Sequence, residues 1–273
     1  MIADLHVHST ASDGTLSPSE LVTRAVARGV RVLAITDHDS VEGLPEGALT
    51  AAAAGIRFVP GVELSSVHEG SDVHVLGYFV DARDPQLRAH LEDLRAARRR
   101  RAEGIVTALQ EAGYAVTIDE VLALSDGGAV GRSHVARALV AGGHAEDVTD
   151  AFSRLLGRGR PFYVPKDVRS PADAISVIRD AGGIPVLAHP GVTGIDAIVP
   201  DLVAAGLEGI EAYHAEHTPE QRERYAALAE ELGLLVTGGS DFHGPQAPNP
   251  ELGTVELPPG AVDRLLEAGA ARR

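Results

Sequence analysis

The chain has 273 residues, 44% of them hydrophobic, which is enough for one large α/β barrel or two ordinary domains and argues against disorder. It contains no cysteine, so disulfides, thiolate-bound zinc and a cysteine nucleophile are excluded, and any metal must be bound by nitrogen and oxygen. The formal net charge of −15 argues against binding of duplex nucleic acid, yet a small anion can still bind at a locally positive site.

The start of the chain, MIADLHVHS, lacks the basic residues and the apolar run of a signal peptide. No stretch approaches the ~20 apolar residues that a membrane span needs. We therefore expect a soluble cytoplasmic protein that has no membrane partner.

Short β-branched apolar runs alternate with helical patterns, which is typical of βαβ units around a parallel sheet. In α/β barrels the catalytic groups gather where the strands end, so the pattern predicts one shared site. The predicted strands are Ile2–His8, Val32–Thr36, Phe58–Glu63, Val73–Val80, Ile184–Ala188, Gly209–Tyr213 and Leu234–Gly238.

Three helix starts support this organisation. Each combines a capping Ser or Thr, a Pro at the first helical position and a reciprocal acidic or amide side chain. They begin at Ser17, Ser170 and Thr218.

The alternation of strands and helices stops between Asp84 and Lys166, where Leu and Ile recur at helical spacing without strands. We predict a barrel formed by residues 1–83 and 167–273. Residues 84–166 are predicted to form a helical insertion that caps the active-site face.

Nine potential metal ligands lie where predicted strands end, and a set this large exceeds what one ion can use. Imidazole and carboxylate together bind Zn²⁺, Mn²⁺ and Fe, so the set predicts a multinuclear hydrolytic site. The ligands are His6, His8, Asp13, His38, Glu63, His74, His189, Asp241 and His243.

The spacing of these ligands is informative. His6 and His8 are two apart on a strand and therefore share a face, with Asp4 as the expected orienting partner. Glu63 ends the third predicted strand, and a carboxylate there can bridge two ions about 4 Å apart. Asp241 and His243 can serve different ions and so tie two metal positions together.

Other charged residues have less specific interpretations. Arg132 and Arg160 are flanked by glycine and suit bidentate contacts with phosphate. Arg98–Arg101 are expected to form a solvated helix face. The alternative that one of these arginines contacts the substrate stays open. Four histidines without a strand-end context are expected at the surface or in loops: His68, His90, His144 and His217.

Taken together, the motifs resemble the polymerase and histidinol phosphatase (PHP) family over the whole chain. The resemblance implies a distorted seven-stranded (β/α) barrel with a trinuclear site that hydrolyses phosphoesters. The motifs are Asp4-Leu5-His6-Val7-His8-Ser9, Thr36-Asp37-His38-Asp39, Gly61-Val62-Glu63, His74 in His-Val-Leu-Gly-Tyr, Ala188-His189-Pro190 and Gly239-Ser240-Asp241-Phe242-His243.

The resemblance also implies how the ligands divide among two to three divalent ions (Mn, Fe or Zn). Glu63 would be shared between the first two metals. Some relatives have His at the position of Asp13, which bears on the third metal. The implied sets are His6, His8, Glu63 and Asp241 for the first metal, Glu63, His74 and His189 for the second, and Asp13, His38 and His243 for the third.

The insertion, with Gly131–His134, Gly159–Pro165 and Glu211–His214, is similar to a branch of stand-alone enzymes. These dephosphorylate nucleoside 3′,5′-bisphosphates, and some trim short RNA or DNA from the 5′ end. The similarity implies metal-assisted hydrolysis of a phosphomonoester or a terminal phosphodiester in a nucleotide or short oligonucleotide. We expect catalytic roles for Glu63, Arg132 and His214, and substrate contacts for Arg132, His134, Arg160 and His214.

Alternatives stay open at this point. His214 can protonate the leaving group, donate to phosphate or be structural. The substrate can instead be a small metabolite such as histidinol phosphate, or the barrel can be a non-catalytic module that binds nucleotides. A metal-dependent amidohydrolase would need a ligating Lys on a middle strand, and no strand end offers one.

Overall fold

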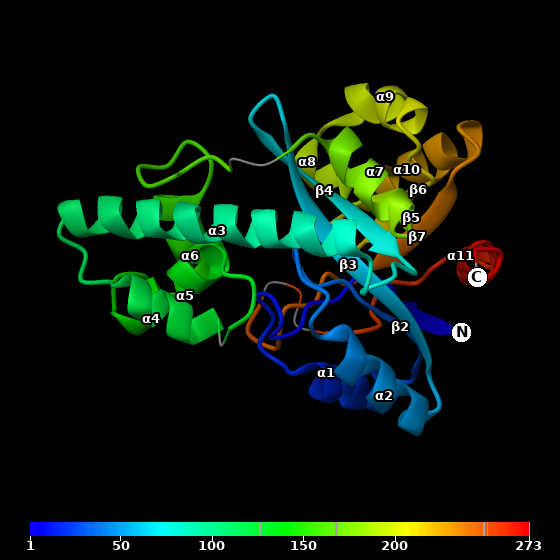
Figure 1. Ribbon diagram of the computed structural model, residues 1–273, viewed down its shortest axis with the longest axis horizontal. Coiled ribbons are helices and arrows are strands. Elements are labelled where there is room, and N and C mark those ends of the chain that lie inside the picture. The colour runs from blue at the N-terminus through cyan, green and yellow to red at the C-terminus, as the bar shows by residue number, and fades with distance from the viewer. Residues whose placement is uncertain (126, 167–168, 248, 250, 273) are drawn as a thin grey trace.

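The computed structural model describes residues 1–125, 127–166, 169–247, 249 and 251–272. A seven-stranded sheet curls into a nearly closed barrel on one side, and the helices of the insertion project from it on the other (Figure 1). The predicted fold class is therefore confirmed. The predicted domain boundary at residue 167 lies outside the described residues, and the division into domains stays a prediction.

The strands follow one another around the barrel in chain order, so each neighbours the next. Every predicted strand is present, with ends that differ by several residues in places. The strands are β1 (Ile2–Asp4), β2 (Val30–Ile35), β3 (Arg57–His68), β4 (Ser71–Tyr78), β5 (Ile184–Leu187), β6 (Gly209–His214) and β7 (Leu235–Gly239).

The prediction of a wholly parallel sheet is wrong at β4, which runs antiparallel to both β3 and β5. Only Glu69 and Gly70 link β3 to β4, and both have positive φ, at 47° and 75°. Such a pair suits a tight hairpin turn that matches the twist of the strands. Glu63 and His74 consequently lie within a hairpin ladder, not at strand ends.

The segment after β1 closes the barrel against the segment after β7. Leu5 N donates to Gly238 O at 3.3 Å, and His8 N donates to Phe242 O at 2.9 Å. Val7 and Phe242 form an isolated parallel bridge. The two ligand-bearing segments, residues 6–8 and 241–243, are thus side by side although they lie at opposite ends of the chain.

Alternate strand residues enter different cores, as the two-residue period of a strand requires. Val32 and Ala34 of β2 pack in one apolar cluster, whereas Leu33 and Ile35 pack in another. The second cluster joins the sheet to its covering helices. These helices are α1 (Pro18–Ala27), α2 (Leu44–Ala54), α7 (Pro171–Asp180), α8 (Pro190–Thr193), α9 (Val199–Ala204), α10 (Pro219–Glu231), α11 (Ala261–Ala270) and a 3₁₀ turn, η2 (Asp196–Ile198).

All three predicted helix starts are confirmed. Ser17, Ser170 and Thr218 cap α1, α7 and α10, each with a capping box. These caps satisfy backbone N–H groups that a helix cannot pair internally, and each such cap contributes about 1 kcal/mol.

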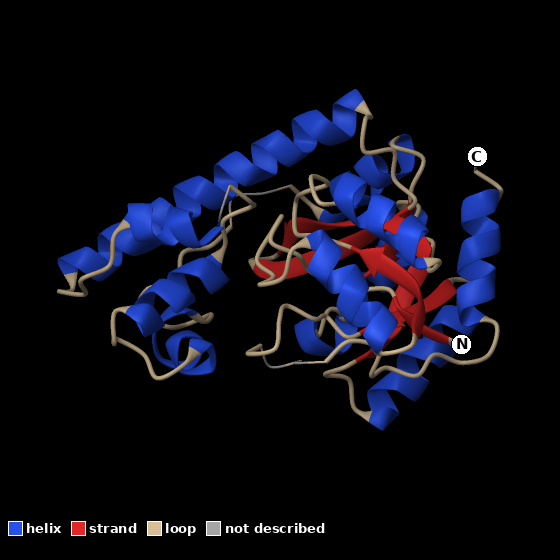
Figure 2. Ribbon diagram, turned by 90° about the horizontal axis from the view of Figure 1, so that it is seen from below, coloured by secondary structure: helices blue, strands red, loops and turns tan. Residues whose placement is uncertain are grey.

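The insertion is built on one long helix, which runs from beside the barrel to the far end of the insertion in Figure 2. This helix contributes to two cores. Leu87, Leu91 and Leu94, near its start, pack in the barrel core, whereas Ile105 and Leu109 pack in a separate apolar cluster. No helix of the described residues is long and apolar enough to cross a membrane. The insertion comprises α3 (Pro85–Glu111), α4 (Ile118–Ser125), α5 (Arg132–Ala141), α6 (Val148–Ala151) and a π-helical turn, η1 (Phe152–Leu156).

Candidate metal centre

Glu63, in the middle of β3, lies at the centre of a cluster of histidines. Its Oε2 is 2.9 Å from His38 Nδ1 and 3.2 Å from His6 Nε2. Its Oε1 is 2.8 Å from His74 Nδ1 and 3.1 Å from His189 Nε2. The two carboxylate oxygens therefore face two different groups of imidazoles, which is the arrangement a carboxylate needs to bridge two ions.

A second carboxylate, Asp241, lies just after β7. Its Oδ1 is 3.1 Å from His8 Nε2 and 3.4 Å from His6 Nε2. Beside it, Asp13 Oδ1 is 3.2 Å from His243 Nε2, and the rings of His8 and His243 stack at 4.1 Å between centroids. The structure thus brings all nine predicted ligands into one cluster, and their division among ions stays a prediction.

Several nitrogen and oxygen atoms of this cluster are buried and most of them lie close to a charged neighbour, yet their geometry gives no hydrogen bond among the described residues. They include both ring nitrogens of His8, Oδ1 of Asp13, and Nδ1 of His38 and of His74. An unpaired buried polar atom costs about 1–3 kcal/mol, so proteins rarely keep one without a reason. Four groups of three or four residues place their ligand atoms within 4.8 Å of one another. These residues fit divalent ions bound by nitrogen and oxygen.

The histidines of the cluster differ in protonation. Burial, reinforced by neighbouring imidazoles, lowers the pKa of His8 to about 3. Burial and the Lys166 ammonium likewise lower the pKa of His74 to about 3. Although burial acts to lower the pKa of His243, the Asp13 carboxylate outweighs it and raises that pKa to about 10. If these predicted ligands bind a metal at neutral pH, His8 and His74 can do so without losing a proton, whereas His243 must first lose one.

Backbone strain gathers at the same place. Asp39, His189 and Asp241 have φ values of 50°, 27° and 52°, in the left-handed region that side chains disfavour. Hydrogen bonds hold two of these positions, because Ser65 N donates to Asp39 Oδ1 at 2.7 Å and His189 N donates to Glu211 Oε2 at 2.9 Å. The fold maintains these conformations at two predicted ligands, His189 and Asp241, and at the residue that follows His38.

Glu211, for which no individual role was predicted, completes the surroundings of His6. It is buried in β6, and its Oε1 lies 3.0 Å from His6 Nδ1. Asp4, the expected partner, accepts a hydrogen bond from the backbone of His6 at 3.4 Å, and further bonds come from the backbone and hydroxyl of Ser240. Glu211 therefore orients the His6 ring so that Nε2 faces the cluster. The sequence feature that could have identified Glu211 is its position as an acidic residue within the apolar run Gly-Ile-Glu-Ala.

His214, at the end of β6, is buried beside Asp241. Its Nε2 is 3.5 Å from Asp241 Oδ2, and its Nδ1 accepts a hydrogen bond from the backbone of Glu216 at 3.2 Å. Because Nδ1 accepts, a neutral ring carries its proton on Nε2. His214 thus presents an N–H group toward the cluster.

Three cationic side chains gather beside the predicted metal ligands, and we call Arg101, Arg132 and Lys166 the cationic group. Arg132 Nη2 donates to Asp72 Oδ2 at 2.9 Å, and Lys166 Nζ lies 3.7 Å from the same oxygen. Lys166 Nζ is also 3.0 Å from His74 Nε2. The guanidinium groups of Arg101 and Arg132 both lie over the ring of Tyr163. Although burial acts to raise the pKa of Asp72, the charges of Lys166, Arg132 and Arg101 help to lower it.

The other predicted substrate contacts are placed differently. His134 is buried in the first turn of α5, where its Nδ1 accepts from Gly131 N at 3.0 Å. Burial lowers the pKa of His134 to about 4, so the ring is neutral at physiological pH. Arg160 is exposed in the turn after η1. The structure brings Arg132 close to the metal ligands, and the substrate roles of all three residues stay predictions.

The expectation of a solvated face at Arg98–Arg101 is wrong for two of its members. Arg98 is nearly buried, pairs with Asp39 and donates to Ser65 Oγ at 2.9 Å. Arg101 is buried and donates to Val164 O at 2.6 Å. Because Arg98 and Arg101 are three residues apart, they lie on the same face of α3. That face contacts the barrel through Asp39 and the end of the insertion through Val164.

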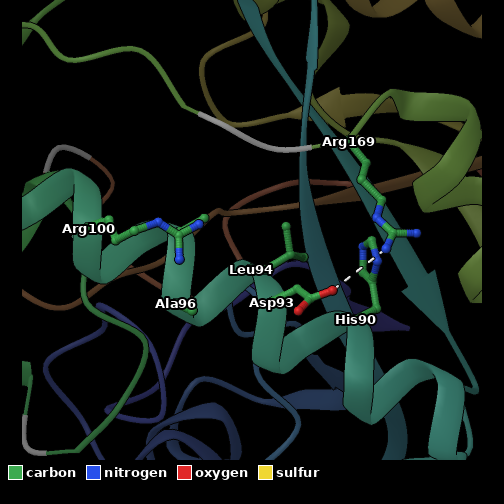
Figure 3. A pocket seen from close by; sticks show the side chains of 7 residues that line it. His90, Asp93, Leu94, Ala96, Arg100 and Arg169 are labelled. Atoms are coloured by element: carbon green, nitrogen blue, oxygen red, sulfur yellow. Dashed lines mark ion pairs between the residues drawn. The ribbon is translucent and has the colours of Figure 1, made fainter.

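A hollow of about 320 Å³ lies on α3 away from this cluster (Figure 3). It is lined in part by His90 and by the ion pair of Arg169 with Asp93, 3.6 Å apart. No predicted metal ligand lines it. His90 was expected at the surface or in a loop, which is wrong, because it lies on the buried face of α3.

Comparisons with known proteins agree with this picture. A family model described as the PHP domain matches residues 4–159. A 5′-3′ exoribonuclease of Haemophilus influenzae is 41% identical over 247 residues, which cover 89% of this chain and 90% of that protein. A 3′,5′-nucleoside bisphosphate phosphatase of Chromobacterium violaceum is 39% identical across 98% of each protein.

A solved structure from Chromobacterium violaceum, described as an amidohydrolase with bound sulfate and no metal, is 38% identical. It covers 98% of this chain and 97% of its own, with a TM-score of 0.90. The Lys that an amidohydrolase would carry on a middle strand is not found among the described strand residues, since Lys166 lies in the loop after the insertion. The predicted enzyme class, a phosphoric ester hydrolase, is that of both relatives named above. The family model covers more than half of the chain, and the chain therefore belongs to the PHP domain family.

Proposed function

We propose that this protein is a metal-dependent phosphoesterase that removes the 3′-phosphate of nucleoside 3′,5′-bisphosphates and hydrolyses short 5′-phosphorylated oligonucleotides. The observation that carries the proposal is the convergence of buried imidazoles on both oxygens of Glu63. The two relatives that match nearly the whole chain are named for these two activities.

Two to three divalent ions, of Mn, Fe or Zn, would occupy the cluster in the three ligand sets predicted from the sequence. The shared position of Glu63 supports a bridging role between the first two sets. When bound, the ions would activate water and offset the charge of the phosphate. His38 Nδ1 lies 2.9 Å from Glu63 Oε2, so the third set adjoins the first two.

The cationic group would bind a second phosphate of the substrate. Arg132 is about one-fifth exposed and Lys166 is nearly buried, so contacts made here are only partly screened by water. Burial lowers the pKa of Lys166 to about 8, which leaves most of its charge at neutral pH. In a protein of net charge −15, this local excess of positive charge favours a doubly phosphorylated substrate over one with a single phosphate.

His214 would donate a hydrogen bond to the leaving oxygen. Its Nε2–H group points at the cluster, and the backbone of Glu216 fixes the tautomer. Such donors act by being held in place before charge develops on the leaving oxygen.

A substrate screen tests the proposal. The protein loaded with Mn²⁺ would be assayed against adenosine 3′,5′-bisphosphate, a 5′-phosphorylated trinucleotide, histidinol phosphate and an aryl phosphate. We expect the highest kcat/KM for the bisphosphate. A clear preference for histidinol phosphate would favour the small-metabolite alternative, and no hydrolysis of any ester would favour a non-catalytic nucleotide-binding barrel.

A further inference from the structure

The loop between β1 and α1 carries Asp13, and the insertion holds this loop in place. Ala129 N donates to Ala11 O at 3.1 Å, and Arg137 Nη2 donates to the backbone carbonyl of Asp13 at 2.9 Å. A Cβ on Gly128 would lie only 2.5 Å from Thr10 O, so the backbone of Gly128 and that of the Asp13 loop are in direct contact, with no side chain between them. The start of α5 and the loop of Asp13 thus form one contact surface.

Ser133 acts on the carboxylate of Asp13 itself. Its Oγ donates to Asp13 Oδ2 at 2.7 Å, between residues 120 positions apart in the sequence. Asp13 Oδ1 has no hydrogen-bond partner among the described residues and lies 3.2 Å from His243 Nε2. One oxygen is therefore held by the insertion while the other faces the metal-ligand cluster.

This arrangement separates Asp13 from the ligands that lie on strands. Glu63 and His74 lie in the ladder between β3 and β4, where backbone pairing limits their movement. Asp13 lies in a turn, so no strand ladder holds its side chain, and the contact that reaches it from the insertion is the Ser133 hydroxyl in the first turn of α5.

We propose that Ser133 is a positioning residue that holds Asp13 for metal binding and couples docking of the insertion to occupancy of the third metal position. The inference rests on the proposed assignment of Asp13, His38 and His243 to that position. Because coupling between two binding events is reciprocal, an ion bound there also stabilises the contact between α5 and the Asp13 loop.

Mn²⁺ titration of the full-length protein by calorimetry, without substrate, tests this proposal. Ser133→Ala should weaken one Mn²⁺ site about ten- to a hundredfold, as loss of a group that orients a ligand usually does, and leave the remaining sites unchanged. Ser133→Thr keeps the hydroxyl and should restore the affinity. Ser153→Ala, at an exposed insertion serine, is the matched control.

Hydrogen exchange supplies a second readout. In the wild-type protein, Mn²⁺ should increase the protection of the α5 amides, and this increase should be lost in Ser133→Ala. Unchanged Mn²⁺ affinity in Ser133→Ala would overturn the proposal, as would an equal loss at every site.

Asp13→Ala separates this inference from the proposed function. If Asp13→Ala binds Mn²⁺ as the wild type does, Asp13 is not a ligand and the role of Ser133 fails with it. Hydrolysis of adenosine 3′,5′-bisphosphate by the wild-type protein is measured independently, and its outcome decides the proposed function alone.

Discussion

The barrel and the insertion contribute to the site in different ways. The barrel supplies Glu63, His6 and His74 from strands or from segments hydrogen-bonded to them, and all three point into one buried cluster. The insertion supplies Arg132 and Ser133, which act through side-chain contacts with Asp72 and Asp13. Metal binding requires ligands placed to within a few tenths of an ångström, and a strand ladder provides that placement. Discrimination between substrates with one and two phosphates needs less exact placement. A positive charge near the second phosphate is sufficient, and a separate helical segment can supply it.

The largest effect should follow from a change at the centre of the barrel cluster. Glu63→Ala removes the carboxylate that faces both groups of imidazoles, and metal analysis should show losses from two positions. We expect kcat/KM to fall at least about a thousandfold, which corresponds to about 4 kcal/mol of transition-state stabilisation. Glu103→Ala, at an exposed glutamate of α3, is the control. Full metal content in Glu63→Ala would contradict the bridging role.

A smaller loss of metal affinity is expected from a change at Glu211, which contacts the predicted ligand His6. Glu211→Gln keeps the size of the side chain but removes the charge that faces His6 Nδ1. Orienting partners of this kind usually contribute ten- to a hundredfold to metal affinity, and we expect a loss in that range in an Mn²⁺ titration. If the affinity is unchanged, the role of Glu211 is limited to supporting the backbone of His189.

Arg132 of the insertion should affect substrate choice without affecting metal content. Arg132→Ala should lower kcat/KM for adenosine 3′,5′-bisphosphate about ten- to a hundredfold, since a hydrogen bond to a charged group contributes about 1.5–3 kcal/mol. The kcat/KM for an aryl phosphate should be retained. Arg99→Ala, at an exposed arginine of α3, is the control. Equal losses on both substrates would place Arg132 at the reacting phosphate.

The smallest expected effect is the pH dependence of Mn²⁺ affinity. It arises from His243, which pairs with Asp13 where the barrel meets the insertion. His243 has its pKa raised to about 10, so its proton must leave before it binds a metal. Mn²⁺ affinity should therefore increase as pH rises from 6 to 9. Calorimetry at pH 7.5 in two buffers of different ionisation enthalpy should show about one proton fewer released by His243→Asn than by the wild type. Heats that do not depend on the buffer would contradict this account.

The raised pKa of His243 makes Mn²⁺ affinity increase with pH, but it makes the stability of the metal-free protein decrease with pH. A raised pKa means that the folded state holds the proton more tightly than the unfolded state does. The stabilisation by the pair of His243 and Asp13 is therefore complete below pH 6.5 and is lost as the pH rises toward 10.

Sequence patterns were sufficient for the seven strands, because alternation is a local feature. The nine predicted ligands do gather, although Glu63 and His74 lie within a hairpin ladder and not at the strand ends from which the gathering was predicted. The direction of β4 was missed, since it depends on the backbone conformation of Glu69 and Gly70. The link between His6 and Glu211 was missed because the two residues are 205 positions apart. The burial of Arg98 depends on Asp39 of the barrel, so helix periodicity alone could not reveal it.

Anomalous diffraction from crystals grown with Mn²⁺ would locate the bound ions themselves. We expect at least two ions around Glu63, one beside His74 and His189 and the other beside His6 and His8. A third ion is expected beside Asp13. Crystals whose ions lie elsewhere, or a protein that binds no divalent ion with all nine ligands intact, would contradict this expectation.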